Sequence, residues 1–306
     1  MCGIVGIFDI HGKRNFDEAL VSRMNDSLTH RGPDDAGLYF EPGLALGHRR
    51  LSILDLSPAG HQPMKSDDGN VIVVFNGEIY NFMELRAELE AEGISFRSHC
   101  DTEVIVRGWQ VWGEDCVNRF RGMFAFAIWD RNAETLFLGR DRLGIKPLYI
   151  AQLDDGRLAF ASELKALYLL PDLPRTIDPQ AVEDYFAYGY IPDPKTILKS
   201  VRKLPPGYVL RQRRGDPAAT PRQYWDLVFN PDHDLDQDAI TEELVPRLSE
   251  AVRIRMIADV PLGAFLSGGV DSGAVVAMMA GLSPDPINTY AIGFDQPDYD
   301  ERRYAQ

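Results

Sequence analysis

The chain has 306 residues, which is enough for two domains that each bury a core. Its formal net charge of −14 argues against a nucleic-acid backbone as the main partner, and no apolar run is long enough to span a membrane. Its three cysteines form neither a disulfide framework nor a metal-ligand spacing, so we expect no metal site of that kind and a reducing, cytoplasmic setting.

Residues 1 to about 165 predict a strand-rich domain that is interrupted by two helices. The first helix begins near Asn81, with Glu84 three residues later as a capping-box partner, and ends at Gly93. The second follows Asp101 and ends at Gly113. Short apolar runs typical of buried strands or hairpins lie at residues 71–75, 123–129, 135–139, 147–151 and 157–162.

Prolines and glycines punctuate residues 206–236, which we interpret as a linker with one short strand at 208–213. Apolar residues then recur every four positions from residue 240 to residue 256 and predict a helix. Because Pro246 lies inside this stripe, the helix is expected either to kink there or to start later than Thr241.

An apolar strand, the loop SGGVDS (267–272), an apolar helix over 274–280 and a strand over 287–294 follow. This order is typical of a parallel α/β domain. About one β-α-β unit is present, so we expect residues 237–306 to be a truncated domain.

The second residue of the chain is a cysteine, Cys2. Removal of Met1 would leave a free α-amine on it. Such an amine titrates near about 7.7–8.0 and a thiol near about 8.5, so close to neutrality the amine can take the thiol proton, and one residue supplies nucleophile and base. The alternative is a buried cysteine on an N-terminal strand. For Cys100 and Cys116 we favour core packing.

Five further residues could serve a site around Cys2. Asn76 and Gly77 offer a side-chain amide beside a glycine N–H, the two donors of an oxyanion hole, although Asn-Gly is also a strong turn signal. Arg50 could hold a carboxylate or lie on the surface. Asp101 could bind an ammonium or cap the helix that follows it, and Glu78 could bind the same ammonium or be a solvated charge.

Seven motifs occur together, namely CGI (2–4), HRGPDD (30–35), HRRLSI (48–53), NGEIYN (76–81), DTEV (101–104), GMFAFAIWD (122–130) and GRDRLGIKPLY (139–149). Through these motifs, most of residues 1–205 resembles the class II glutamine amidotransferases. The resemblance implies an α+β domain over 1–205 with the N-terminal nucleophile hydrolase fold, an αββα sandwich.

The resemblance also implies a role for each candidate residue. Cys2 would attack the side-chain amide of glutamine, with Asn76 and Gly77 as the oxyanion hole. The other glutamine contacts would be Arg50 at the α-carboxylate, Glu78 and Asp101 at the α-amine, and the segment Leu51, Ser52, Ile53 and Leu54 along the pocket.

The loop SGGVDS lies between an apolar strand and a helix, where paired glycines and a helix N-terminus suit a pyrophosphate, but it lacks the Walker lysine. It resembles the loop of the N-type ATP pyrophosphatases. That resemblance makes 237–306 the start of an α/β parallel-sheet ATP-binding domain and implies Mg²⁺ with the ATP. The implied ATP contacts are Leu266, Ser267, Gly268, Gly269, Asp271, Ser272 and Ile292.

Both parts together resemble the N-terminal half of the glutamine-hydrolysing asparagine synthetase family. The implied reaction adenylates aspartate with ATP, and ammonia from glutamine then displaces AMP to give asparagine, AMP and pyrophosphate. Aspartate as the acceptor rests on resemblance alone, because the part that would recognise it is absent.

Two alternatives stay open. One is an amidotransferase for another carboxylate, such as a sugar or small-molecule acid, and the other is an idle homologue that binds glutamine or a nucleotide. A homodimer is left open.

Overall fold

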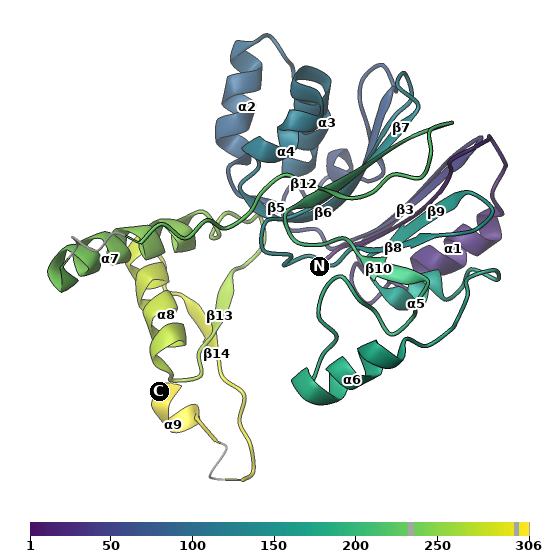
Figure 1. Cartoon of the computed structure of the whole chain (residues 1–306). Coiled ribbons are helices and arrows are strands. Elements are labelled where there is room, and N and C mark those ends of the chain that lie inside the picture. The colour runs from purple at the N-terminus through teal and green to yellow at the C-terminus, as the bar shows by residue number, and fades with distance from the viewer. Residues whose placement is uncertain (232–235, 297–299, 306) are drawn as a thin grey trace. The chain divides into compact units, whose positions relative to one another are not determined.

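The computed structural model describes residues 1–231, 236–296 and 300–305. The chain forms two compact units, Met1–Leu227 and Val228–Gln306 (Figure 1). Residues 232–235 of the predicted linker, and residues 297–299 and 306 of the predicted second domain, lie outside the described residues.

Two six-stranded sheets form the first unit, and neighbouring strands in both sheets pair in antiparallel fashion. In spatial order, the first sheet contains β10 (Val201–Lys203), β8 (Tyr149–Gln152), β9 (Arg157–Ala161), β1 (Gly3–Asp9), β3 (Leu44–Arg50) and β2 (Asp35–Glu41). The second contains β12 (Arg222–Gln223), β11 (Tyr208–Arg213), β7 (Thr135–Arg140), β6 (Gly122–Asp130), β5 (Val71–Ile79) and β4 (Met64–Lys65).

The strands predicted from apolar runs are confirmed as β5 to β9, and the short strand predicted at 208–213 is confirmed as β11. Because β11 pairs with β7, this strand extends the second sheet of the first unit.

Helices lie on the outer faces of the two sheets (Figure 1). On the second sheet they are α2 (Phe82–Ala91), α3 (Asp101–Trp112) and α4 (Cys116–Arg119), with the 3₁₀ turn η2 (Gly113–Asp115) between the last two. On the first sheet they are α1 (Glu18–Asp26) and α5 (Leu164–Leu167). The remaining helical elements of the unit are η1 (Pro58–Gly60) and α6 (Pro179–Tyr188).

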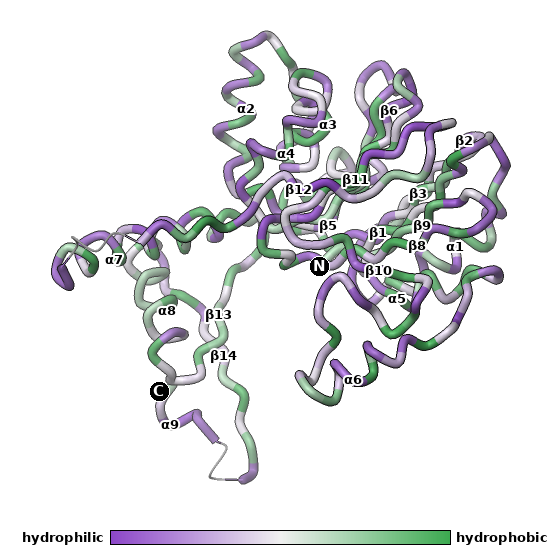
Figure 2. Tube along the Cα trace, in the orientation of Figure 1, coloured by the Kyte–Doolittle hydropathy of each residue, from purple (hydrophilic) through white to green (hydrophobic). Residues whose placement is uncertain are grey.

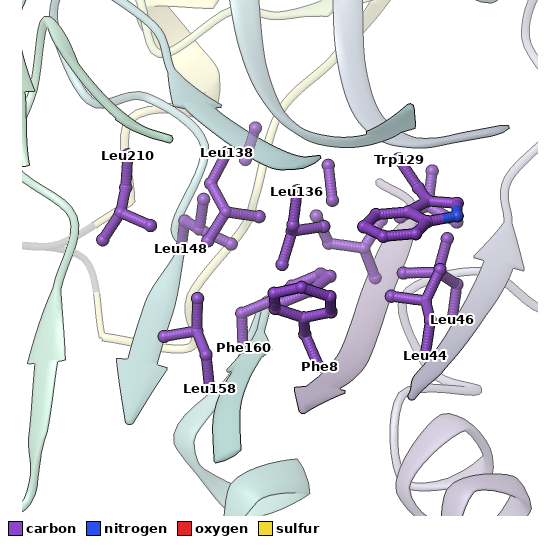
Figure 3. Packing of buried hydrophobic residues seen from close by; sticks show 14 of the residues in the cluster. Phe8, Leu44, Leu46, Trp129, Leu136, Leu138, Leu148, Leu158, Phe160 and Leu210 are labelled. Atoms are coloured by element: carbon purple, nitrogen blue, oxygen red, sulfur yellow. The ribbon is translucent and has the colours of Figure 1, made fainter. Parts of the chain in front are cut away.

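The central strands are buried on both faces, which is why they read as nearly continuous apolar runs. On β1, Phe8 points into the space between the sheets, while Val5 and Ile7 pack outward against α1. Phe8 meets Trp129 of the facing sheet with ring centroids 5.3 Å apart. Figure 3 shows this inter-sheet core, with Leu44, Leu46, Leu158 and Phe160 from one sheet and Leu136, Leu138 and Leu210 from the other. The first unit is therefore a four-layer α-β-β-α sandwich.

The predicted capping box at α2 is wrong. Asn81 is the N-cap residue, but its side chain makes no capping hydrogen bond. Its Oδ1 accepts from Arg121 N at 2.8 Å, and its Nδ2 donates to Arg119 O at 3.0 Å. Pairing with the segment before β6 satisfies both ends of the amide, so tertiary contact prevails over local capping.

The second unit holds α7 (Gln237–Arg253), β13 (Gly263–Phe265), α8 (Val270–Leu282), β14 (Asn288–Tyr290) and α9 (Arg302–Ala305). β13 and β14 pair in parallel, as the order strand, loop, helix, strand predicts. The strand predicted over 287–294 is wrong beyond Tyr290, because only three residues of each strand find a partner. Figure 2 shows that most of α8 is hydrophobic.

Of the two alternatives for the helix around Pro246, the start later than Thr241 is wrong. α7 begins at Gln237, since the side chain of Asp236 caps it by accepting from Ala239 N at 2.9 Å. Pro246 lies inside the helix.

Candidate active site

Cys2 lies at the start of β1, where several groups hold the chain end. The guanidinium of Arg31 donates from Nε to Cys2 O at 2.9 Å, and Ile4 N donates to Ser162 Oγ at 3.0 Å. The backbone N–H of Leu51 donates to Cys2 Sγ at 3.4 Å. The thiol is therefore held against the end of β3 within the first unit.

Burial shifts the pKa of the Cys2 thiol and the pKa of the amine at the chain terminus in opposite directions. It raises the pKa of the Cys2 thiol, an effect that the N–H of Leu51 partly offsets. Burial lowers the pKa of the α-amine, here on Met1. Base-assisted attack by the thiol would use the α-amine that Cys2 itself gains when Met1 is removed.

Asn76 and Gly77 lie inside β5, so the alternative interpretation as a turn is wrong. The Asn76 side chain is fully buried, and neither its amide nitrogen nor its amide oxygen has a hydrogen-bond partner among the described residues. A buried amide without partners costs about 1–3 kcal/mol, which a ligand at this position would recover.

The N–H of Gly77 points away from β6, because N–H groups alternate between the two edges of an antiparallel strand. The N–H groups on that edge to either side are taken by side chains. Phe75 N donates to Gln62 Oε1 at 2.7 Å and Ile79 N to Asp101 Oδ2 at 2.8 Å. The Gly77 N–H between them therefore faces the cavity described below.

Gly77 also has a packing reason to be glycine. A Cβ at this position would come within 2.2 Å of Met123 O and 2.7 Å of the Phe124 Cα. The close approach of β6 thus excludes any side chain at this point of β5.

Glu78 and Asp101 face the same cavity. Burial raises the pKa of both carboxyl groups, and at Glu78 the charge of Asp101 adds to the effect. The buried carboxylate of Asp101 and the half-buried carboxylate of Glu78 repel each other when no cation is bound, so an ammonium placed between them would be attracted to both. The helix-cap interpretation of Asp101 is not supported, since α3 starts at Asp101 itself and its N-cap residue is Cys100.

The opposite wall of the cavity is the loop after β3, which wraps around the guanidinium of Arg50. Arg50 Nη2 donates to Leu54 O and Asp55 O, and Nη1 donates to Ser57 O. These bonds use three of the five guanidinium N–H groups, which leaves two for a ligand.

The cavity has a volume of about 30 Å³. Among the predicted site residues, Cys2, Arg50, Leu51, Ile53, Leu54, Gly77, Glu78 and Asp101 line it. Asn76, which is fully buried, and Ser52 do not line it. The Ser52 N–H donates to Asp34 Oδ2 at 2.8 Å.

Sequence reasoning missed Gln62, Phe75 and Thr102, which also line the cavity. Gln62 bridges two elements, since its Oε1 accepts from Phe75 N and its Nε2 donates to Thr102 Oγ1 at 3.2 Å. His48 was missed as well: it is buried between the sheets, its Nε2 lies 2.9 Å from Phe75 O, and burial lowers its pKa to about 3. Cys100 is buried, as predicted, and also lines the cavity, while Cys116 is buried away from it.

The predicted ATP contacts lie in the second unit, around the loop between β13 and α8. Gly268 has a φ of +81°, a conformation that favours glycine. The hydroxyl groups of Ser267 and Ser272 lie 3.0 Å apart across the loop, and Gly269 is the N-cap residue of α8. Leu266 N donates to Tyr290 O at 2.8 Å, Asp271 is in the first turn of α8, and Ile292 is exposed.

Membrane-spanning helices and metal-binding clusters are both absent from the described residues. These residues contain no helix that is both long and apolar enough to cross a membrane. They also contain no cluster of three or more histidine, cysteine or acidic side chains that could hold a metal ion.

Comparison with known families gives two matches along the chain. The family described as "Glutamine amidotransferase domain" matches residues 1–225, and the family described as "Asparagine synthase" matches residues 243–306.

Curated relatives carry similar names. The chain is 37% identical over 303 residues to "Asparagine synthetase [glutamine-hydrolyzing] 1" of Bacillus subtilis, covering 98% of this chain and 47% of that protein. It is 39% identical over 329 residues to a "Putative asparagine synthetase [glutamine-hydrolyzing] 2" of Methanocaldococcus jannaschii, covering 100% of this chain and 62% of that protein. A third relative, "Amidase chry2" of Gibberella zeae, is 36% identical over 291 residues, covering 89% of this chain and 42% of that protein. The chain thus spans about half the length of the curated relatives it matches.

Among solved structures, the glutamine phosphoribosylpyrophosphate amidotransferase of Bacillus subtilis matches with a TM-score of 0.56 at 17% identity, covering 95% of this chain and 65% of that one. This likeness shows an amidotransferase fold of the N-terminal nucleophile hydrolase type. The chain therefore belongs to the class II glutamine amidotransferases, with an asparagine synthase domain sequence after the amidotransferase domain.

Proposed function

We propose that the chain is the glutamine-hydrolysing part of an asparagine synthetase. One observation carries the proposal: Cys2, Gly77 of β5, the Glu78–Asp101 pair and Arg50 line one cavity, and the neighbour of Gly77 on β5, Asn76, has a buried amide without a hydrogen-bond partner among the described residues. The name shared by the relatives from Bacillus subtilis and Methanocaldococcus jannaschii supports the choice of product.

In the proposed reaction, the α-amine freed by removal of Met1 takes the proton from the Cys2 thiol. The sulfur then attacks the side-chain carbonyl carbon of glutamine, and the Asn76 amide and the Gly77 N–H stabilise the oxyanion that forms. The C–N bond breaks, the leaving nitrogen receives the proton from the amine, and ammonia departs. Water hydrolyses the thioester to give glutamate and restores the thiol.

The charged ends of glutamine match the two polar walls of the cavity. Its ammonium would lie against Glu78 and Asp101, and its carboxylate would take the two N–H groups that Arg50 retains. A volume of about 30 Å³ is much smaller than the roughly 300–1,000 Å³ of usual ligand pockets, so we expect the loop after β3 to move outward on binding.

For the second unit we propose binding of ATP at the loop between β13 and α8. The residues fit a pyrophosphate, because a left-handed turn at Gly268 leads into the N-terminus of α8, and both features favour the binding of anions. Mg²⁺ would arrive with the nucleotide, since the described residues form no acidic cluster of their own. Bound ATP would supply the adenylyl group that activates the acceptor carboxylate.

A second candidate function is amination of a carboxylate other than that of aspartate. The relative named as an amidase, at 36% identity, favours it, because similar sequences occur in proteins with other names. Incubation with Mg²⁺-ATP, glutamine and a panel of carboxylic acids separates the two candidates. Asparagine formed from aspartate supports the first, and an amide formed only from another acid supports the second.

The hydrolysis step is tested with Cys2→Ala in protein whose Met1 removal is verified by intact mass. We expect glutamate release from glutamine to fall to background, while Cys116→Ala, a buried cysteine away from the cavity, retains activity. A folded Cys2→Ala variant that still releases glutamate would contradict the proposal.

A further inference from the structure

Gln62 is a buried glutamine that lines the cavity around Cys2 and joins two of its walls. Its side chain is only 4% exposed. The backbone N–H of Phe75 can only donate, so it fixes which end of the amide faces β5: Oε1 accepts from Phe75 N at 2.7 Å. The other end, Nε2, donates to Thr102 Oγ1 at 3.2 Å. One side chain thus connects an edge of β5 with the first turn of α3.

The register of β4 and β5 explains why Gln62 reaches Phe75. Met64 pairs with Val73. Two residues further along, the same antiparallel register places Gln62 opposite Phe75. Because β4 begins only at Met64, Phe75 is bound there by the side chain of Gln62 instead of by a strand backbone. The ladder between β4 and β5 therefore ends in a side-chain hydrogen bond.

This ending leaves the next N–H on the same edge of β5 open to the cavity. In an antiparallel strand every second N–H faces the same edge, so those of Phe75, Gly77 and Ile79 share this one. Gln62 takes the first, and Asp101 Oδ2 takes the third at 2.8 Å. The Gly77 N–H lies between two N–H groups that side chains hold in place.

These contacts close into a ring. From Phe75 the ring runs through Gln62 to Thr102, and from the adjacent Asp101 it returns to β5 at Ile79. Residues two apart on an antiparallel strand are about 6.8 Å apart. The ring therefore holds the Gly77 N–H and the carboxylate bound at Ile79 at a fixed separation.

The backbone of Gln62 is itself confined by the neighbouring sheet. A Cβ on Gly37 of β2 would lie 2.0 Å from Gln62 O, so the two backbones are already in close contact. Gln62 therefore has little room to move away from β5.

We propose that Gln62 is a positioning residue for glutamine: by joining the edge of β5 to the start of α3, it sets the separation between the Gly77 N–H and the Asp101 carboxylate. The inference rests on the proposed glutamine hydrolysis. Glutamine carries its reacting amide and its α-amine at opposite ends of a flexible chain, and both ends must reach their partners at once. Without the link, the carbonyl would lie out of line with the oxyanion hole, and a misplacement of about 1 Å can cost about a hundredfold in rate.

The test compares Gln62→Met, which keeps the length of the side chain and removes both hydrogen bonds, with Gln212→Met as the matched control. Gln212 is 1% exposed and equally bonded, because its Oε1 accepts from Ala219 N at 2.7 Å and its Nε2 donates to Arg213 O at 2.9 Å. It does not line the cavity. A second pair of variants is Thr102→Val, which removes the hydroxyl group, and Thr102→Ser, which keeps it.

All proteins are used as the full chain with Met1 removed. The readouts are kcat and KM for glutamine, hydrogen exchange of the Phe75 and Ile79 amides resolved by NMR, and Tm. Hydrogen exchange is included because it does not require turnover.

For Gln62→Met we expect kcat/KM to fall by about tenfold to a hundredfold, with a lower kcat and a higher KM, because both ends of the substrate lose alignment. The Ile79 amide, which Gln62 does not contact, should exchange faster together with that of Phe75. Thr102→Val should show the same changes to a smaller extent, and Thr102→Ser should match the unmodified chain. Gln212→Met should lower Tm as Gln62→Met does, because each leaves buried groups unpaired, but its kinetics should stay unchanged.

Kinetics of Gln62→Met equal to those of Gln212→Met would overturn the proposal, since Gln62 would then act on stability alone. Unchanged exchange at Ile79 in Gln62→Met would also overturn it, because the ring would not be coupled. If Gln62→Met does not fold, the Thr102 variants decide, and equal kcat and KM in the two would contradict the proposal. If the unmodified chain failed to hydrolyse glutamine, the proposed function would fail, while exchange at Ile79 would still show whether Gln62 holds β5 to α3.

Discussion

The two units of the chain bury their apolar residues to very different degrees. In the first unit, β6 and β7 are covered on both faces, and Trp129, Phe137 and Leu138 are each at most 1% exposed. In the second unit, α8 is more hydrophobic than α7, yet Met279 is its only buried residue, and Phe265 on β13 is 76% exposed. Apolar composition alone does not build a core; a second apolar layer must cover it.

This difference matters for the proposed functions. The cavity around Cys2 is lined entirely by residues of the first unit, whose apolar core is buried, so the proposed hydrolysis of glutamine does not depend on residues of the second unit. The loop that we propose for ATP follows a strand of a two-stranded sheet that has exposed apolar residues on both strands. We therefore expect the second unit to be the less stable of the two.

Hydrogen exchange should show the largest contrast between the units. Amides of β6 should exchange at least about a thousandfold more slowly than those of β13 and β14, because core strands open only by global unfolding. The measurement is exchange followed by peptide mass spectrometry on the full chain. Equal protection in both sheets would show that the second unit is stable as it stands.

The next largest effect should come from Asn76→Ala in the first unit. Loss of one oxyanion donor typically lowers turnover by about a hundredfold to a thousandfold. KM for glutamine should change little, and Tm should not fall, because the amide has no partner to lose. A variant with normal kcat and a raised KM would instead assign Asn76 to ground-state binding.

A smaller effect should follow from the pH dependence of glutamine binding. The pKa values of Glu78 and Asp101 are raised, so lowering the pH protonates carboxylates that the substrate ammonium needs. KM for glutamine should therefore rise as the pH falls through that range, and in Glu78→Gln it should be higher and less dependent on pH. Steady-state kinetics at several pH values measures this. A KM that is independent of pH in the unmodified chain would contradict the role of the pair.

The smallest expected effect is on Tm. Removing the Glu78 charge should raise Tm, whereas removing one partner of an ordinary ion pair lowers it. A carboxyl group with a raised pKa in the folded state contributes stability at low pH that is lost as the pH rises. Glu78→Gln should therefore raise Tm at pH 8 by about 2–4 °C, the shift expected for about 1 kcal/mol in a unit of this size, and leave it nearly unchanged at pH 4. Thermal unfolding at the two pH values checks this. A lower Tm at pH 8 would show that Glu78 is paired in the folded state.

The fold could be predicted from the sequence where burial on both faces leaves continuous apolar runs, as in β6. It could not be predicted for β3, whose sequence LALGHRR shows only weak alternation of polar and apolar residues. The reason is that the polar residues His48 and Arg50 occupy buried positions of this strand. Asn81 shows a different limit. Its local signal indicated a helix cap, but a segment about forty residues away satisfies its side chain.

The site was predicted largely through motifs that carry a known chemistry, with Cys2 and Asn76 as the leading examples. Residues such as Gln62 were missed, because its role is to join β5 to Thr102, and only the folded chain brings those segments together.

The central claim is that a freed α-amine and thiol on Cys2 hydrolyse glutamine. The most direct measurement separates protein that retains Met1 from protein that has lost it, confirms each by intact mass, and compares glutamate release. Retained Met1 would turn the base into an amide, so we expect activity only in the processed fraction and in proportion to it. Equal activity in a fraction that fully retains Met1 would contradict the claim.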